Sequence, residues 1–108
     1  MEAAAKILAQ VVPAAVTETV LYTVPTSQNV LIQELCVCNR SGSPASFRVS
    51  ISVGGGATAT KDYLYYDTPL PGNDTFATDI GVTLYQTDVI RVYTVQGTLS
   101  FTLIGART

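Results

Sequence analysis

The strict alternation of apolar and polar residues over residues 46–53 is the feature that most constrains the fold. The apolar members are Phe47, Val49, Ile51 and Val53, and the polar members between them are Ser46, Arg48, Ser50 and Ser52. Successive side chains of a strand point to opposite faces, so this pattern predicts a strand with one face in the core and the other in solvent. Residues 99–103 repeat the pattern.

Short strand patterns of this kind recur along the chain and are divided by turn signals. We expect about eight strands, at 19–24, 30–39, 46–53, 62–68, 74–79, 81–85, 88–95 and 99–104. The 13 Val and 15 Thr of the 108 residues favour pleated sheets. The predicted fold class is all-β: an antiparallel, jelly-roll-like β-sandwich, with residues 13–108 as its single domain.

Residues 1–12 differ from the rest and are predicted to form an N-terminal arm. Glu2 and Lys6 form an i, i+4 pair that favours a helix, and Pro13 bars its continuation, so the arm is expected as a short helix or an extended segment. Its apolar side chains must dock on the chain's own core or on a neighbour. The arm residues predicted for self-association or partner binding are Ile7, Leu8, Val11 and Val12.

Two strand patterns carry apolar residues on both faces. In 30–38 strict alternation puts Val30, Ile32, Cys36 and Cys38 on one face and Leu31, Leu35 and Val37 on the other, and 89–95 behaves similarly. A sandwich normally leaves one face of each sheet in solvent. These strands therefore predict cover from an arm, a loop or another subunit.

The residue inventory argues against several classes of function. The chain has no His, which removes the commonest general base and metal ligand, and two Cys are too few for a structural zinc site. Six scattered Lys and Arg and a net charge of −2 argue against nucleic acid, and no apolar stretch is long enough for a membrane helix. We expect no catalytic residues, cofactor or metal.

Cys36 and Cys38 lie two residues apart in a strand pattern, so a disulfide between them would need a distorted strand. They are interpreted as small buried thiols, with a disulfide between subunits as the alternative. The sequons at Asn39–Ser41 and Asn73–Thr75 are interpreted as turn chemistry.

Four aspartates, Asp62, Asp67, Asp74 and Asp79, are the main acidic concentration. Carboxylates at such spacing could bind Ca²⁺ or form a glycosidase pair. The Pro, Gly and Asn around Asp74 instead favour a structural role in turns.

One strand places tyrosines on both of its faces, at Tyr63, Tyr65 and Tyr66. Such a strand favours a core on one face and an interface on the other, with stacking against a sugar as the alternative. Arg48 and Arg91 could pair with carboxylates across an interface, and a surface pair that adds little stability is the equal alternative. Glu34 is the single charge of 30–39. The candidate interface residues are Glu34, Arg48, Tyr63, Tyr65, Tyr66 and Arg91.

A series of motifs over residues 18–106 resembles a group of roughly hundred-residue virion accessory proteins of tailed bacteriophages. The motifs occur here in the order Val20–Pro25, Val37–Ser41, Phe47–Val49, Tyr65–Pro71, Asn73–Thr75, Gly81–Leu84, Asp88–Tyr93 and Leu99–Gly105. The resemblance implies a small β-sandwich that decorates or cements the particle, often as a homotrimer, on the capsid or in the tail and fibre region.

The expected function is therefore structural: a capsid cement protein in the virion, assembled in the host cytoplasm, whose partners are itself and the major capsid protein or a tail component. A tail-fibre or baseplate protein is the alternative within the virion. A carbohydrate-binding module that uses Tyr63, Tyr65 or Tyr66 is the alternative from another class, with a glycan as its partner. An enzyme is not expected.

Overall fold

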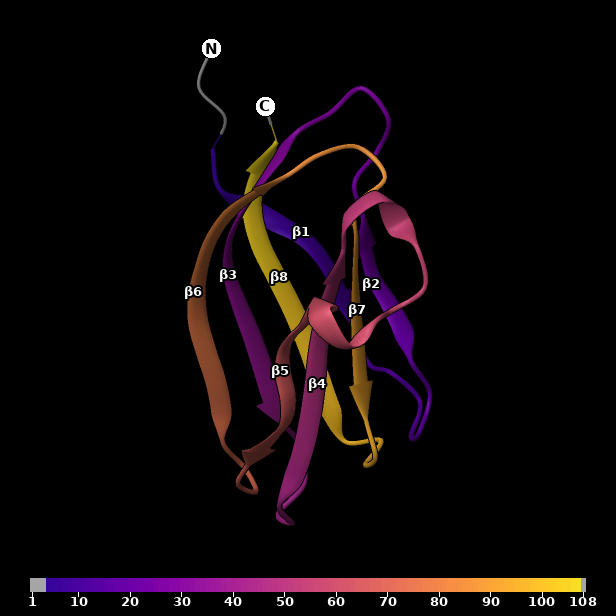
Figure 1. The fold of residues 1–108 in the computed structure, drawn as a ribbon. Coiled ribbons are helices and arrows are strands. Elements are labelled where there is room, and N and C mark those ends of the chain that lie inside the picture. Colours follow the sequence, from indigo (N-terminus) through magenta and orange to yellow (C-terminus); the bar gives the residue numbers. More distant parts are fainter. Residues whose placement is uncertain (1–3, 108) are drawn as a thin grey trace.

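The eight strands of the computed structural model, which describes residues 4–107, lie in two four-stranded antiparallel sheets packed face to face (Figure 1). The all-β sandwich prediction is confirmed. The strands are β1 (Lys6–Val11), β2 (Thr19–Thr23), β3 (Val30–Asn39), β4 (Ala45–Ser52), β5 (Tyr63–Leu70), β6 (Thr75–Leu84), β7 (Val89–Thr94) and β8 (Leu99–Arg107). Two short 3₁₀ turns, η1 (Val53–Gly55) and η2 (Thr60–Asp62), lie between β4 and β5.

Sheet A has the strand order β1-β8-β3-β6, and sheet B has the order β2-β7-β4-β5. All connections except the one from β4 to β5 cross from one sheet to the other, which is the arrangement of a jelly roll. Strands β1 and β2 therefore form one edge of the sandwich, and β5 and β6 form the opposite edge.

Residues 6–11 of the predicted N-terminal arm form an edge strand of the sandwich and are extended, not helical. β1 pairs with β8, and a bulge at Leu8 turns Ala9 and Val11 toward Leu103 and Phe101. The Glu2 end of the expected Glu2–Lys6 pair lies outside the described residues. Because β1 completes sheet A, the segment is part of the domain.

A β-bulge in β3 corrects the interpretation of residues 30–38 as apolar on both faces. The register shifts between Ile32 and Glu34 against both neighbouring strands, so the side-chain alternation changes phase there. The buried face consists of Val30, Ile32, Leu35, Val37 and Asn39. Of the large aliphatic residues only Leu31 is left on the outer face, where it is half-buried.

The chain itself covers much of the outer face of β4 and β7. Ser50 and Ser52 are buried because the segment between β4 and β5 folds over them, although the alternation predicts them in solvent. The same segment covers Val89, which approaches Gly55. Val53 is exposed and not in the core, since the η1 turn begins there and ends the alternation. For these strands the cover is a loop.

β6 is one strand, where two were predicted at 74–79 and 81–85. Gly81, at φ 67°, continues the strand past a register shift, a conformation that glycine adopts without steric cost. Its even-numbered side chains, from Phe76 to Leu84, face the core side of sheet A.

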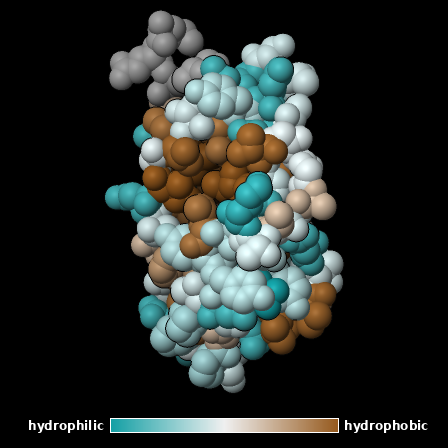
Figure 2. All heavy atoms as spheres, viewed as in Figure 1, coloured by the Kyte–Doolittle hydropathy of each residue, from teal (hydrophilic) through white to brown (hydrophobic). Residues whose placement is uncertain are grey.

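The edge formed by β5 and β6 is closed at one end and open at the other. At the closed end, Phe47, Tyr65 and Phe76 form an aromatic cluster, with Tyr65 and Phe76 ring centres 5.3 Å apart, and the Tyr65 hydroxyl donates to Thr78 at 3.3 Å. Beyond Tyr63, β5 no longer pairs with β4. Apolar side chains come to the surface beside the upper part of β6 (Figure 2).

We define this opening as the open edge. Among its apolar residues, Ile51 and Ile80 pack on the core but are only partly covered. Val82 is 38% exposed, and Leu64 lies exposed at the start of β5.

Candidate functional site

Two bulges in β5 distribute the tyrosines between the faces of sheet B. Tyr65 pairs with Val49 and faces the core, whereas Tyr63 pairs with Ser50 and faces outward. Tyr66 and Asp67 together oppose the single residue Arg48, and Asp67 has the left-handed φ of 50° that Asp tolerates better than most residues. The bulges therefore bring Tyr63 and Tyr66 to the same outer face.

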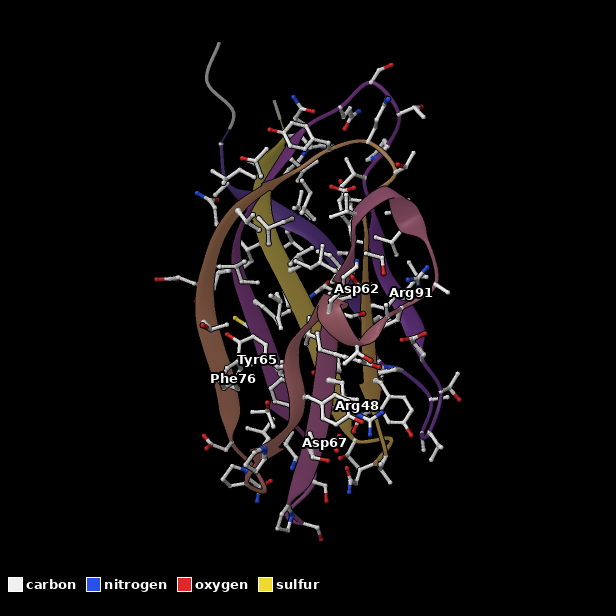
Figure 3. The ribbon with its side chains drawn as sticks, in the orientation of Figure 1. Arg48, Asp62, Tyr65, Asp67, Phe76 and Arg91 are labelled. Atoms are coloured by element: carbon white, nitrogen blue, oxygen red, sulfur yellow. The ribbon has the colours of Figure 1, made fainter. Side chains whose placement is uncertain are left out.

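Arg48 is the centre of this outer face. Its guanidinium carbon lies 4.2 Å from the centre of the Tyr66 ring and 4.7 Å from that of Tyr93, which is its cross-strand neighbour on β7. Its Nε donates to Asp67 Oδ1 at 2.7 Å (Figure 3). The hydrogen bond to Asp67 raises the pKa of the guanidinium above its ordinary value. The guanidinium cation thus lies against two aromatic rings and is paired with a carboxylate.

A cavity of about 480 Å³ lies beside this cluster. Its lining residues are Thr58, Ala59, Thr60, Tyr63 and Tyr66. The Tyr63 and Tyr66 rings meet edge to face, with centres 4.9 Å apart. One wall is thus aromatic and the other is a threonine-rich loop, and none of the five lining residues carries a charge.

Asp62 holds the loop wall in place. Its Oδ2 accepts the Ala59 backbone N–H at 2.8 Å and the Ser52 hydroxyl at 3.3 Å, and its Oδ1 accepts from Lys61 at 3.1 Å. These bonds, that of the Ala59 amide foremost, lower the pKa of the Asp62 carboxyl below its ordinary value. The carboxylate acts as a structural clamp.

Arg91 fixes the other side of the same loop. Its guanidinium donates to the Ser52 hydroxyl and the Gly56 carbonyl at 2.9 Å, and to Gly55 O and Thr58 Oγ1 at 3.3 Å. Arg91 and Arg48, both predicted as interface residues, lie on the same outer face of sheet B. The hydrogen bonds of Arg91 described above are all made within the chain.

The remaining candidates lie elsewhere. Tyr65 belongs to the core cluster with Phe76. Glu34 lies on the outer face of sheet A, where it pairs in register with Asp79, another carboxylate. The structure therefore brings together Arg48, Tyr63 and Tyr66 and separates Tyr65 and Glu34 from them.

Both cysteines are free thiols, half-buried on the outer face of sheet A. Burial raises the pKa of Cys36, and the nearby Glu34 raises it further. Neither change favours a reactive thiolate.

The four aspartates do not converge. Asp62 clamps a loop and Asp67 pairs with Arg48, while Asp74 accepts the Thr75 amide at 2.8 Å and Asp79 faces Glu34. Over residues 4–107, no group of three His, Cys, Asp or Glu side chains is arranged to hold a metal ion. The positions agree with structural roles in loops and strand pairs.

The sequon at Asn39 lies in a buried network. The side chain of Asn39 is 1% exposed and donates to the carbonyls of Ser43, Leu70 and Pro71, while its oxygen accepts from the Ser41 amide and the Thr98 hydroxyl. It joins the loops at one end of the sandwich, as turn chemistry predicts.

The four predicted arm residues divide into two pairs. Leu8 and Val11 pack against the core of their own chain, whereas Ile7 and Val12 are 56% and 54% exposed. A shallow hollow of about 320 Å³ lies at the Val12 end of the arm and is lined by Gln10, Val11, Val12, Ser100, Phe101 and Thr102. Ile7 and Val12 are the arm residues still available to a partner.

No protein-family model matches the chain, and no curated protein matches it either. In the part of the chain that the structure describes, no helix has the length and apolar character needed to cross a membrane. Two features of the described residues bear on function: the Tyr63–Tyr66 face of sheet B and the apolar edges of the sandwich.

Proposed function

We propose that this protein is a structural component of a tailed-bacteriophage virion, a capsid decoration protein that acts by associating with copies of itself and with the capsid. The virion assignment is supported by the series of motifs over residues 18–106. The mode of action is supported by one structural observation: apolar side chains remain uncovered at two opposite edges of the sandwich.

The first apolar patch runs along β1 and the following residue Val12, and we call it the arm edge. Ile7 and Val12 are more than half exposed there, and β1 pairs with a neighbour on one side only. An unprotected edge strand is a template for contact with another chain. Lys6 is the only charged residue of β1.

The second apolar patch is the open edge between β5 and β6. Val82 and Leu64 are 38% and 46% exposed there, and Ile51 and Ile80 lie half-covered beside them. An apolar strand edge of another molecule could pack against these partly uncovered side chains.

The occupant of the open edge is the arm edge of a second copy. Two different patches on opposite sides of one molecule make a head-to-tail contact, and such contacts close into a ring when the rotation permits. A ring of three copies agrees with the trimer that the motif resemblance implies. In such a ring both patches of every copy are covered.

A cement protein of this kind needs no catalytic residue. A protein that binds only the assembled lattice stabilises that lattice by its binding free energy, and a ring multiplies weak contacts through effective concentration.

The test is made on particles of the source phage. Mass spectrometry of purified virions should detect the protein, and cryo-electron microscopy should place it on the outer surface of the capsid. Absence from virions would overturn the proposal. Density confined to the tail would overturn the capsid placement in favour of a tail-associated role.

A further inference from the structure

We propose that the cavity beside Tyr63 and Tyr66 is a binding site for a neutral saccharide. The site lies on the outer face of sheet B, and none of its lining residues belongs to the arm edge or the open edge. It is proposed as a second activity beside self-association.

The lining has the chemistry that a sugar requires. The Tyr63 and Tyr66 rings offer apolar surface to the C–H face of a pyranose, and Tyr66 is 57% exposed. Within residues 4–107, the hydroxyls of Thr60, Tyr63 and Tyr66 have no hydrogen-bond partner in the chain. Three unused hydroxyls beside aromatic rings can bind the hydroxyls of a ligand.

The charges around the cavity select against an ionic ligand. Three cations lie next to the lining, and all have partners within the chain. Arg48 pairs with Asp67 at 2.7 Å and Lys61 with Asp62 at 3.1 Å, while Arg91 donates to the Thr58 and Ser52 hydroxyls and to the Gly55 and Gly56 carbonyls. An anionic ligand would have to compete with these partners, and a cationic ligand finds no carboxylate among the lining residues. A neutral polyol can bind without displacing the partners of these cations and without a carboxylate of its own to pair with.

The walls are held in place before a ligand arrives. Tyr66 stacks on Arg48, which Tyr93 supports from its other side. On the loop side, Arg91 and Ser50 contact Thr58, and Asp62 fixes Ala59. A preformed cavity loses little conformational entropy on binding, and about 480 Å³ lies within the range of small-ligand sites, roughly 300–1,000 Å³.

The test is a glycan array carrying neutral, sialylated and sulfated glycans, probed with the full-length protein and followed by calorimetry on the neutral glycans bound. Tyr63→Ala and Tyr66→Ala should each weaken binding about tenfold or more, because each removes a ring from the wall. Thr60→Val, which keeps the shape of the side chain, should weaken binding by a smaller factor. The matched control is Tyr85→Ala, an equally exposed tyrosine outside the cavity, and it should change binding less than twofold.

Binding to no neutral glycan, binding to anionic glycans alone, or unchanged affinity in both tyrosine variants would overturn the proposal. Thermal melting and light-scattering mass are measured on every variant. These readouts keep the result separate from the assembly proposal, since loss of glycan binding with an unchanged mass concerns this site alone.

Discussion

The guanidinium of Arg48 lies 4.2 Å from the centre of the Tyr66 ring, because a bulge in β5 sets Tyr66 and Asp67 together against that one arginine. The Tyr66 ring packs against the guanidinium, and the Asp67 carboxylate accepts hydrogen bonds from its Nε and Nη2. The bulge therefore positions the groups that contact the Arg48 guanidinium. Through Tyr66 it also positions one wall of the adjoining cavity.

Replacement of Arg48 should lower the melting temperature in a graded way. Arg48→Lys keeps the charge but loses the planar stacking and the fixed fork of donors, so we expect a loss of about 2 °C, and Arg48→Ala should lose more. Calorimetry at low and high salt is the measurement. If Arg48→Lys has the same melting temperature as the wild type, the stacking of the guanidinium on the rings does not contribute to stability.

Asp62 should make stability depend on pH in the acid range. Its pKa is lowered in the folded protein, so its contribution is fully present above the unfolded value of about 3.8 and is lost as the pH falls through the lower folded value. Asp62→Asn should therefore be less stable than the wild type at pH 6, and the gap should narrow below about pH 3.8. A difference in unfolding midpoint between Asp62→Asn and the wild type that stays constant from pH 6 to pH 2 would show that the Asp62 carboxylate does not stabilise the loop.

Asn39→Ala should destabilise the fold by about 2–3 kcal/mol. The side chain is buried and its loss leaves several carbonyl and N–H groups of three loops without a partner. Urea unfolding measures the change. The control is Asn73→Gly, at an exposed asparagine whose left-handed φ of 56° glycine also adopts. A loss below 0.5 kcal/mol would mean that water replaces the network.

Asp79→Lys should stabilise the protein by about 0.5 kcal/mol. Asp79 and Glu34 are cross-strand neighbours of like charge, and the substitution converts their repulsion into attraction. Asp79→Asn should give a smaller gain, and the gain of the lysine variant should diminish in 1 M salt. A destabilised lysine variant at low salt would contradict this arrangement.

The sequence predicts the sandwich and most of its strands, because alternation and turn residues are local. Phe47 and Val49 face the core as their pattern requires. The alternation of apolar and polar residues does not reveal the β-bulges. A single extra residue in β3, at Gln33, returns Leu35 and Val37 to the same face as Val30 and Ile32. No residue type marks such a position, since the shift is set by the partner strands.

The same limit applies to the candidate site. Tyr63 and Tyr66 were predicted for an interface together with Tyr65, but only the β5 bulges decide which of them face outward. Tyr93, Thr58 and Thr60 were missed. Tyr93 alternates with Val92 and Thr94 in a strand pattern, which could have placed it opposite Arg48, whereas the loop threonines carry no signal in the sequence.

The proposed contact between the arm edge and the open edge is tested most directly by the mass of the protein in solution. Light scattering of the full-length protein should give three times the 11.4 kDa chain mass. Ile7→Lys with Val12→Lys on the arm edge, or Val82→Lys on the open edge, should each give the single-chain mass with an unchanged strand circular dichroism spectrum. Val95→Lys, at an exposed valine that belongs to neither patch, is the control and should keep the trimer mass. A wild-type mass of one chain at every concentration, or edge variants that keep the wild-type mass, would contradict the account.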